Sequence, residues 1–408
     1  MELSAGRRQL RVAALIGLAL AIVLVTGVVY LRPSFPAPAA AVTPPLARPS
    51  VGSAFFADAD HGVVAVIPAN GTGGPLSTLF LTRDGGRTWS RATGGPPSVI
   101  LSSPWFGNRF LVVASTQAGA GVRVSGDGGR TWHMLPLPPS ALQANVVYGA
   151  IGGPVLLSAT DGWWMTLPAP GDPFTVQLWR TMDGSTWTRL PAAGIPSDGY
   201  KGQLWFADDR HGLLLVTTPP ASVSVLATDD GGASWGERAR FGPPFLGAYT
   251  VGASVVSHGD RLVLCLETLP NPPRSGPLAD PFLLSPGLYT ATSTDGGATW
   301  GRLVAGPGFS SATLPLFDDP GRMLLLSDRR LWISETYGAA WQARLVTLPA
   351  GVRVLTLNSA VKGALFAIGV VSTPAPSPRA AGFPPTVLLK SRDGGAHWEQ
   401  LVLPALAR

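Results

Sequence analysis

One short motif constrains the fold of this chain more than any other feature of its sequence. It begins with Ser or Thr, ends with Trp and occurs seven times: TRDGGRTW (82–89), SGDGGRTW (125–132), TMDGSTW (181–187), TDDGGASW (228–235), STDGGATW (293–300), SETYGAAW (334–341) and SRDGGAHW (391–398). The third copy is one residue shorter, and the sixth has Thr336 in place of the Asp. The closing tryptophans follow one another at intervals of 43, 55, 48, 65, 41 and 57 residues. Such a period predicts a repeat architecture.

The residue types of this box motif predict a tight hairpin turn. Asp-Gly and Gly-Gly favour such turns because glycine adopts positive φ without a Cβ clash. The Asp carboxylate can accept N–H groups of its own turn, and the Trp can fold back and pack between strands. We therefore expect an all-β, seven-bladed β-propeller of four-stranded antiparallel blades, in which each box motif joins the last two strands of a blade. We assign a structural role, and no catalytic one, to Asp84, Trp89, Asp127, Trp132, Asp183, Trp187, Asp230, Trp235, Asp295, Trp300, Trp341, Asp393 and Trp398.

These box motifs resemble those of the Asp-box, or bacterial neuraminidase repeat, propellers. A second element also repeats: it reads FFADADHG (55–62) and WFADDRHG (205–212), with a weaker copy LSATDGW (157–163). This element is similar to one in propellers of the photosystem II assembly and stability factor family. The resemblance covers about residues 51–404 and implies the same fold. Nothing in the sequence points to photosynthesis.

The blades can be delimited from the box motifs. We expect boundaries near 51–94, 95–139, 140–197, 198–243, 244–306, 307–348 and 349–404. In the fourth blade the predicted strands are 203–207, 213–217, 223–228 and one that begins near Trp235. In the seventh they are near 354–357, 364–371, 386–390 and 398–403. The extra apolar run Val146–Ile151 makes the third blade the hardest to divide.

The N-terminal segment predicts export. Residues 12–31 carry no charge and would span about 30 Å as a helix, while Arg7, Arg8 and Arg11 precede them. This predicts a cytoplasmic tail (1–11), a membrane or signal anchor (12–31), a Pro/Ala-rich stalk (32–50) and an external propeller (51–408). Cleavage within Ala37–Ala41 would instead give a secreted protein.

Composition excludes some functions. The net charge of +6 comes from scattered basic residues, which argues against a nucleic-acid interface. The single Cys265 lies in an apolar run and cannot form an internal disulfide. We expect no metal or cofactor, because the five histidines form no zinc motif and the turn aspartates Asp58, Asp60, Asp208 and Asp209 lack the spacing of an EF-hand. We also expect the protein to be a monomer. The equivalent positions of His61 and His211 favour a repeated structural bond.

Four irregular insertions predict the binding face. They are 68–77, 168–175, 269–287 and 373–386, and all fall between the second and third strands of their blades. In an antiparallel blade these loops leave from the end opposite the box motifs. We therefore expect an extracytoplasmic protein or glycan to bind this loop-rich face, with Asp172, Arg274, Asp280 and Arg379 as candidate binding residues.

A glycosidase is the alternative, since the Asp-box resemblance includes sialidases. That resemblance implies three arginines that hold a carboxylate, a Tyr nucleophile paired with Glu, and an Asp acid/base. Only Glu267, with Tyr249 or Tyr289, could supply a Tyr/Glu pair, and no Arg-Ile-Pro motif precedes the first box motif. GASWG (232–236) matches a hydrolase pattern but overlaps a box motif, so we interpret it as a chance match. We assign no catalytic residue and favour a non-catalytic binding scaffold.

Overall fold

The computed structural model describes a part of the chain that consists of β-strands and the turns between them. Its described residues are 49–67, 78–92, 98–102, 110–115, 122–125, 131–138, 154–158, 160–166, 174–218, 222–244, 248–270, 287–308, 315–318, 321–327, 329–361, 363–371 and 385–404. All of them belong to a unit that spans residues 47–373 and 384–408. No helix that could cross a membrane occurs among them, and the predicted anchor at 12–31 lies outside them.

The described strands form seven four-stranded sheets, and each sheet contains one box motif between its third and fourth strands. The first four sheets consist of β1 (Ser50–Phe56), β2 (Gly62–Ile67), β3 (Thr78–Thr82) and β4 (Ser90–Arg91); β5 (Ser98–Ser102), β6 (Phe110–Ser115), β7 (Val122–Ser125) and β8 (His133–Leu135); β9 (Val155–Leu156), β10 (Gly162–Thr166), β11 (Gln177–Thr181) and β12 (Thr188–Arg189); and β13 (Tyr200–Phe206), β14 (Gly212–Thr218), β15 (Ser222–Thr228) and β16 (Gly236–Phe241). The last three consist of β17 (Ala248–His258), β18 (Arg261–Pro270), β19 (Gly287–Ser293) and β20 (Val304–Gly308); β21 (Leu316–Phe317), β22 (Met323–Ser327), β23 (Arg330–Ser334) and β24 (Gln342–Leu345); and β25 (Val352–Val361), β26 (Ala364–Val371), β27 (Thr386–Ser391) and β28 (Glu399–Gln400).

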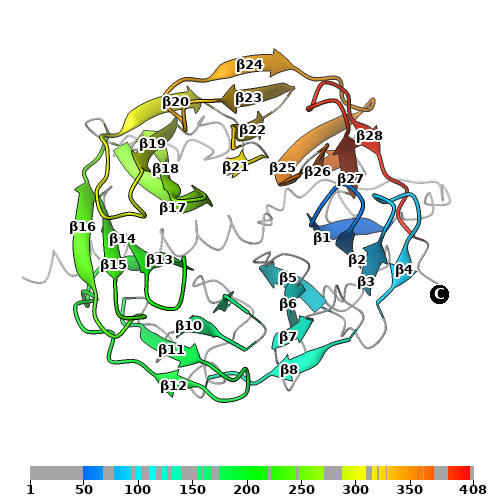
Figure 1. Cartoon of the computed structure of the whole chain (residues 1–408). Helices are drawn as coiled ribbons and strands as arrows, with labels where there is room; N and C mark the ends of the chain where they lie inside the picture. Colours follow the sequence, from blue (N-terminus) through cyan, green and yellow to red (C-terminus); the bar gives the residue numbers. More distant parts are fainter. Residues whose placement is uncertain are drawn as a thin grey trace, which may run out of the picture. The chain divides into compact units, whose positions relative to one another are not determined.

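The sheets follow one another around a centre, with the first strand of each sheet innermost (Figure 1). A separate cluster of buried apolar side chains lies between each sheet and the next, from the first pair to the last. A further cluster joins the seventh sheet to the first, where the rings of Phe56 and Phe366 stack with centroids 3.4 Å apart. The predicted all-β propeller is therefore confirmed.

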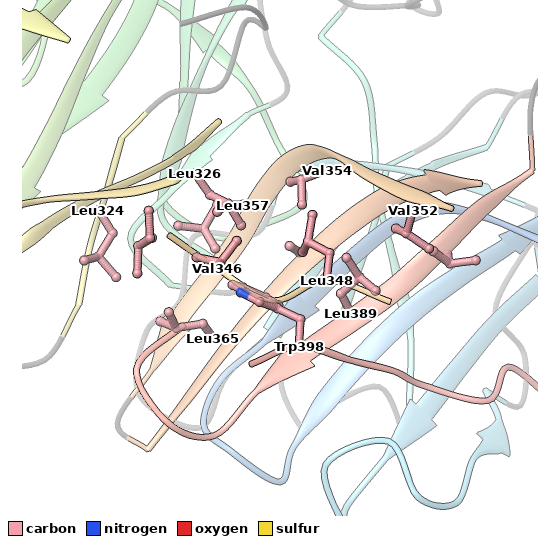
Figure 2. Close-up of a cluster of buried hydrophobic side chains, with 13 residues drawn as sticks. Leu324, Leu326, Val346, Leu348, Val352, Val354, Leu357, Leu365, Leu389 and Trp398 are labelled. Atoms are coloured by element: carbon pink, nitrogen blue, oxygen red, sulfur yellow. The ribbon is translucent and has the colours of Figure 1, made fainter. Parts of the chain in front are cut away.

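The cluster between the sixth and seventh sheets illustrates how these junctions are packed (Figure 2). Leu324 and Leu326 of β22 meet Val354 and Leu357 of β25, and the indole of Trp398 covers them from the box motif. Strands β22 and β26 are buried along almost their whole length, because each has a neighbouring sheet on both faces. This explains why the second strands read as continuous apolar runs and not as alternating ones.

The strands of the fourth and seventh sheets lie close to their predicted positions. In the fourth, the first strand begins at Tyr200, three residues before the prediction, because a bulge between Lys201 and Leu204 lets the chain continue pairing with β14. In the seventh, the second strand has the predicted bounds, and the first is longer on both sides. The extra apolar run of the third blade, 146–151, lies outside the described residues.

The second repeated element is a turn closed by an aromatic ring. Ala57 N–H donates to the His61 carbonyl, and Asp58 Oδ1 accepts the N–H groups of Asp60 and His61. The ring of Phe56 covers Gly62, where a Cβ would lie 2.3 Å from the ring. The second copy repeats this arrangement with Phe206 over Gly212, which explains the glycine that ends both copies.

Replacing Gly62 with alanine should destabilise the fold by about 1–3 kcal/mol, because Phe56 cannot move away from its stacking partner Phe366. Gly236→Ala is the matched control, since nothing lies within 4 Å of its added Cβ. We expect that control to change the free energy of unfolding by less than about 0.5 kcal/mol. Equilibrium urea unfolding of both variants checks this, and equal stabilities would contradict the close packing described.

Candidate functional site

The two ends of the sheets carry different features. At one end, the first turn of a sheet touches its own box motif: Gly85 N–H donates to the Asp60 carbonyl, and Gly231 N–H to that of Arg210. At the other end, the four insertions connect β2 to β3, β10 to β11, β18 to β19 and β26 to β27. The insertions therefore leave from the ends of the strands opposite the box motifs, as the sequence predicts.

The four predicted binding residues lie within these insertions and outside the described residues; they are Asp172, Arg274, Asp280 and Arg379. Their role in binding stays a prediction. The described part of the loop-rich face consists of the strand ends that carry the insertions and the beginnings of the inner strands.

The described aspartates of the box motifs use their oxygens inside their own turns. Asp84 accepts the N–H and the hydroxyl of Thr88, and the Thr82 hydroxyl accepts the N–H of Gly86, whose φ is 89°. The hydroxyl and N–H of Thr88 lower the pKa of Asp84 to about 2. Hydrogen bonds within the turn lower the pKa of Asp230 and Asp295 to about 2 as well. These carboxylates are ionised and internally bonded, so the geometry supports a turn-forming role for them.

The degenerate sixth copy keeps the turn without a carboxylate. The Thr336 hydroxyl accepts the N–H of Ala340 at 2.8 Å, and the Ser334 hydroxyl accepts that of Gly338 at 2.8 Å. Tyr337 occupies the position of the first glycine with a φ of 54°. The guanidinium of Arg261 lies 4.4 Å from the Tyr337 ring centroid.

Six of the described box-motif tryptophans form two groups by the acceptor of their indole hydrogen bond. The indole Nε1 groups of four of them donate to the carbonyl of the glycine three residues before the Trp: Trp235, Trp300, Trp341 and Trp398 donate to Gly232, Gly297, Gly338 and Gly395. Those of Trp89 and Trp187 instead donate to the preceding sheet, at the Val402 and Pro136 carbonyls. Trp132 packs against the first sheet, and Asp127 lies outside the described residues.

Two histidines and a cysteine show no catalytic geometry. His61 Nδ1 lies 2.8 Å from Asp58 Oδ2, and His211 Nδ1 lies 2.8 Å from Asp208 Oδ2. Each pair sits within one exposed turn, and no group of potential metal ligands occurs in the described parts of the chain. Cys265 is buried and free, and burial raises the pKa of its thiol. Its thiol is therefore unsuited to act as a nucleophile.

Glu267 is a buried carboxyl group near the loop-rich end of its sheet. It lies on β18, it is 4% exposed, and it pairs across the sheet with Gly252 and Leu288. A Cβ on Gly252 would lie 3.2 Å from its Oε2, so the carboxyl group packs against bare backbone. Burial alone raises the pKa of Glu267 to about 7, and no described group donates a hydrogen bond to it.

The structure does not bring Glu267 together with Tyr289. Leu288, which pairs with Glu267, belongs to the apolar cluster facing the sixth sheet, whereas Tyr289 packs into the cluster facing the fourth sheet. Successive residues of a strand point to opposite faces, so the two side chains lie on opposite sides of their sheet. The structure does not describe the side chain of Tyr249, so the pairing of Glu267 with Tyr249 stays a prediction.

Two lysines that composition alone does not single out are buried by the fold. Lys390 Nζ donates to the carbonyls of Ala59 and Gly85 in the first sheet and lies 5.0 Å from the Phe366 ring centroid. Burial lowers its pKa. Lys201, at the loop-rich end of β13, donates to the carbonyls of Asp198 and Gly199. Neither local sequence, VLLKS (387–391) nor GYKGQ (199–203), indicates that the lysine is buried.

Arginines do not converge on the described inner strands. Arg353 on β25 is the one arginine that these strands carry. The described part of the chain therefore shows no set of three arginines around the centre.

The comparisons with known proteins identify a fold and no family. No family model and no curated protein matches the sequence. Among solved structures, a prolyl endopeptidase aligns with a TM-score of 0.53 and 12% identity over 87% of this chain and 50% of its own. YCF48 bound to D1 peptide aligns with a TM-score of 0.48 and 17% identity over 79% of this chain and 91% of its own. The α-L-arabinofuranosidase Arb93A of Fusarium graminearum aligns with a TM-score of 0.38 and 10% identity over 85% and 94%. At these identities the likeness concerns the fold alone.

Proposed function

We propose that this chain is an exported, membrane-tethered and non-catalytic propeller that binds a protein or a glycan through its loop-rich face. The observation that carries the proposal is the separation of the two ends of the sheets. All four insertions leave the sheets at one end, whereas the box motifs at the other end use their polar groups within their own turns. Variable loops held by a rigid scaffold are the usual place for recognition.

The location of the protein belongs to the same proposal. The uncharged segment 12–31 after three arginines supports a membrane anchor with the propeller outside, and the proline-rich segment that follows supports a stalk. Strand β1 begins at Ser50, so this stalk would end directly at the first sheet. Membership of the Asp-box propellers is also part of the proposal, and the described turn geometry of the box motifs supports it.

A deletion series on the full chain tests the binding face. The insertions 271–286 and 373–384 are each replaced by Asn-Gly, and the binding of native membrane extract and of a glycan array is compared with the unmodified chain. The matched control replaces His61 and His211, which lie at the opposite end of the sheets, with alanine. We expect the deletions to abolish binding and the control to retain it, with thermal unfolding used to verify that all variants fold. Binding that survives both deletions would contradict the proposal.

A sialidase-like exo-glycosidase is the second candidate function, favoured by the buried carboxyl group of Glu267 near the loop-rich end. In a sialidase-like site Glu267 would pair with a Tyr nucleophile, and a carboxyl group with a pKa near 7 is suited to take up the proton of that Tyr. The opposite orientation of Tyr289 argues against it. Turnover of a fluorogenic sialoside that disappears in Glu267→Gln would establish this candidate in place of the first.

A further inference from the structure

Among the described residues, two junctions between neighbouring sheets are closed by a one-residue parallel bridge at the box-motif end. Between the third and fourth sheets, Ala193 N–H donates to the Ala233 carbonyl at 3.0 Å, and the Ala193 carbonyl accepts the N–H of Trp235 at 2.7 Å. Between the sixth and seventh sheets, Thr347 makes the same pair of bonds with Ala396 and Trp398, at 2.8 and 3.0 Å. In both places the segment after the outer strand fills a slot beside the next box motif.

The position of the bridging residue in the sequence is the same in both cases. Ala193 and Thr347 each lie six residues after the tryptophan of their own sheet's box motif, Trp187 and Trp341. The residue at that position after Trp398 is Pro404, which has no N–H to donate.

The junction with Pro404 uses a different contact. Trp89 Nε1 donates to the Val402 carbonyl at 3.0 Å, four residues after Trp398. The junction between the second and third sheets has the same contact as the junction with Pro404. Pro138 stands at its bridging position, and Trp187 Nε1 donates to the Pro136 carbonyl at 2.5 Å. A proline at the bridging position thus accompanies an indole bond in place of the backbone bridge.

No described residue makes the two bridging bonds in the slot between the seventh and first sheets. The Arg87 carbonyl and the Trp89 N–H correspond to the groups that Ala193 and Thr347 bond elsewhere, and neither has a hydrogen-bond partner among the described residues. A groove of about 480 Å³ lies there, lined by Gly86, Arg87, Arg392, Glu399, Gln400, Leu401 and Val402.

The charges of this groove favour an acidic ligand. Arg87 and Arg392 are exposed, and Glu399 is the one carboxylate among the lining residues. Arg392 Nε lies 3.4 Å from Glu399 Oε1, so this carboxylate offsets one guanidinium and leaves that of Arg87 available. Guanidinium groups bind carboxylates strongly, particularly through two parallel hydrogen bonds.

We propose that this groove binds an extended acidic peptide segment of a partner. A residue of that segment would donate its N–H to the Arg87 carbonyl and accept the Trp89 N–H, which reproduces the bridge that the chain itself supplies at two other junctions. An acidic side chain beside that residue would pair with Arg87 or Arg392. This site lies at the box-motif end and is separate from the loop-rich face.

A designed peptide tests the site with the full chain. The probe is a capped, fluorescently labelled peptide with the sequence of Leu345–Ala350, which forms the bridge between the sixth and seventh sheets, extended by glutamates at both ends. We expect a dissociation constant of about 0.1–1 mM by fluorescence polarisation, in the range of a small and exposed contact. The combined change Arg87→Ala and Arg392→Ala should weaken binding at least about tenfold. Arg83→Ala is the matched control, because Arg83 is exposed in the same box motif but does not line the groove.

Two further peptides separate the bridge from general charge attraction. One carries proline in place of the residue that corresponds to Thr347, and the other carries lysines in place of the glutamates; both should lose binding. Equal binding of the proline peptide, or unchanged binding to the arginine variant, would overturn the proposal, as would the absence of binding by the first peptide. The variant without insertions 271–286 and 373–384 should still bind the peptide, so this result is independent of the loop-rich face.

Discussion

Replacing Trp163 with alanine is expected to lower the free energy of unfolding by about 3–5 kcal/mol. Trp163 is fully buried on β10, and its ring stacks on Phe206 of the fourth sheet with centroids 3.7 Å apart. Its Nε1 donates to the Gly231 carbonyl at 2.7 Å, and the guanidinium of Arg180 lies 4.7 Å from its ring centroid. Alanine would remove the packing and leave a cavity between the third and fourth sheets.

The variant Trp163→Phe separates packing from hydrogen bonding. Phenylalanine can still stack on Phe206 but cannot donate to Gly231, so we expect a loss of only about 1–2 kcal/mol. Urea unfolding followed by circular dichroism measures both variants. Similar losses in the two would show that the indole hydrogen bond, and not the stacked ring, holds this junction.

The stability of the chain is expected to fall by about 3 kcal/mol as the pH rises from about 4.5 to about 7, because of Glu267 alone. Burial raises the pKa of this carboxyl group to about 7 in the folded chain, whereas its ordinary value is 4.5. Below both values the group is protonated in the folded and the unfolded chain and has no effect. Between them the unfolded chain releases the proton and the folded chain keeps it, so unfolding is favoured increasingly. Above about 7 the effect is constant.

The variant Glu267→Gln removes this titration. Its free energy of unfolding should vary less between pH 4.5 and 7 than that of the unmodified chain, and it should exceed it at pH 8. Glu237→Gln is the control, since Glu237 is exposed on β16 and paired with Arg240, which lowers its pKa. The control should keep the original slope in this pH range. An identical pH profile for Glu267→Gln and the unmodified chain would show that the buried carboxyl group is neutralised by another charge.

Much of this fold could be predicted because its repeating unit is local. Each box motif forms its turn from residues within one short segment, such as Thr82, Asp84 and Thr88, and the strands beside it are identified by their apolar runs. The turn after the first strand is also local, since Asp58 bonds His61 three residues later. Side chains and turn chemistry in one stretch of sequence suffice for these features.

The contacts between sheets could not be predicted, because they join residues far apart in sequence. Lys390 reads as a surface lysine in a strand, and only the closed ring places it beneath Ala59 and Gly85. The sequence singles out Glu267 because glutamates are few, but it does not show that this side chain is buried. Its orientation away from Tyr289 depends on the register of β18 and β19. The binding residues of the loop-rich face remain predictions because the insertions have no repeat that would define their conformation.

Closure of the ring through Phe56 and Phe366 has a consequence for biosynthesis. The apolar face of the first sheet, with Val51 and Phe56, is covered by the seventh sheet, which is the last to be made. During translation this apolar surface would therefore stay exposed to solvent until the seventh sheet has been synthesised. Contacts between residues so far apart in sequence also form slowly. We expect holdase chaperones to bind this exposed surface. A premature stop codon within the seventh sheet would give an aggregation-prone product, even though most of its sheets could form.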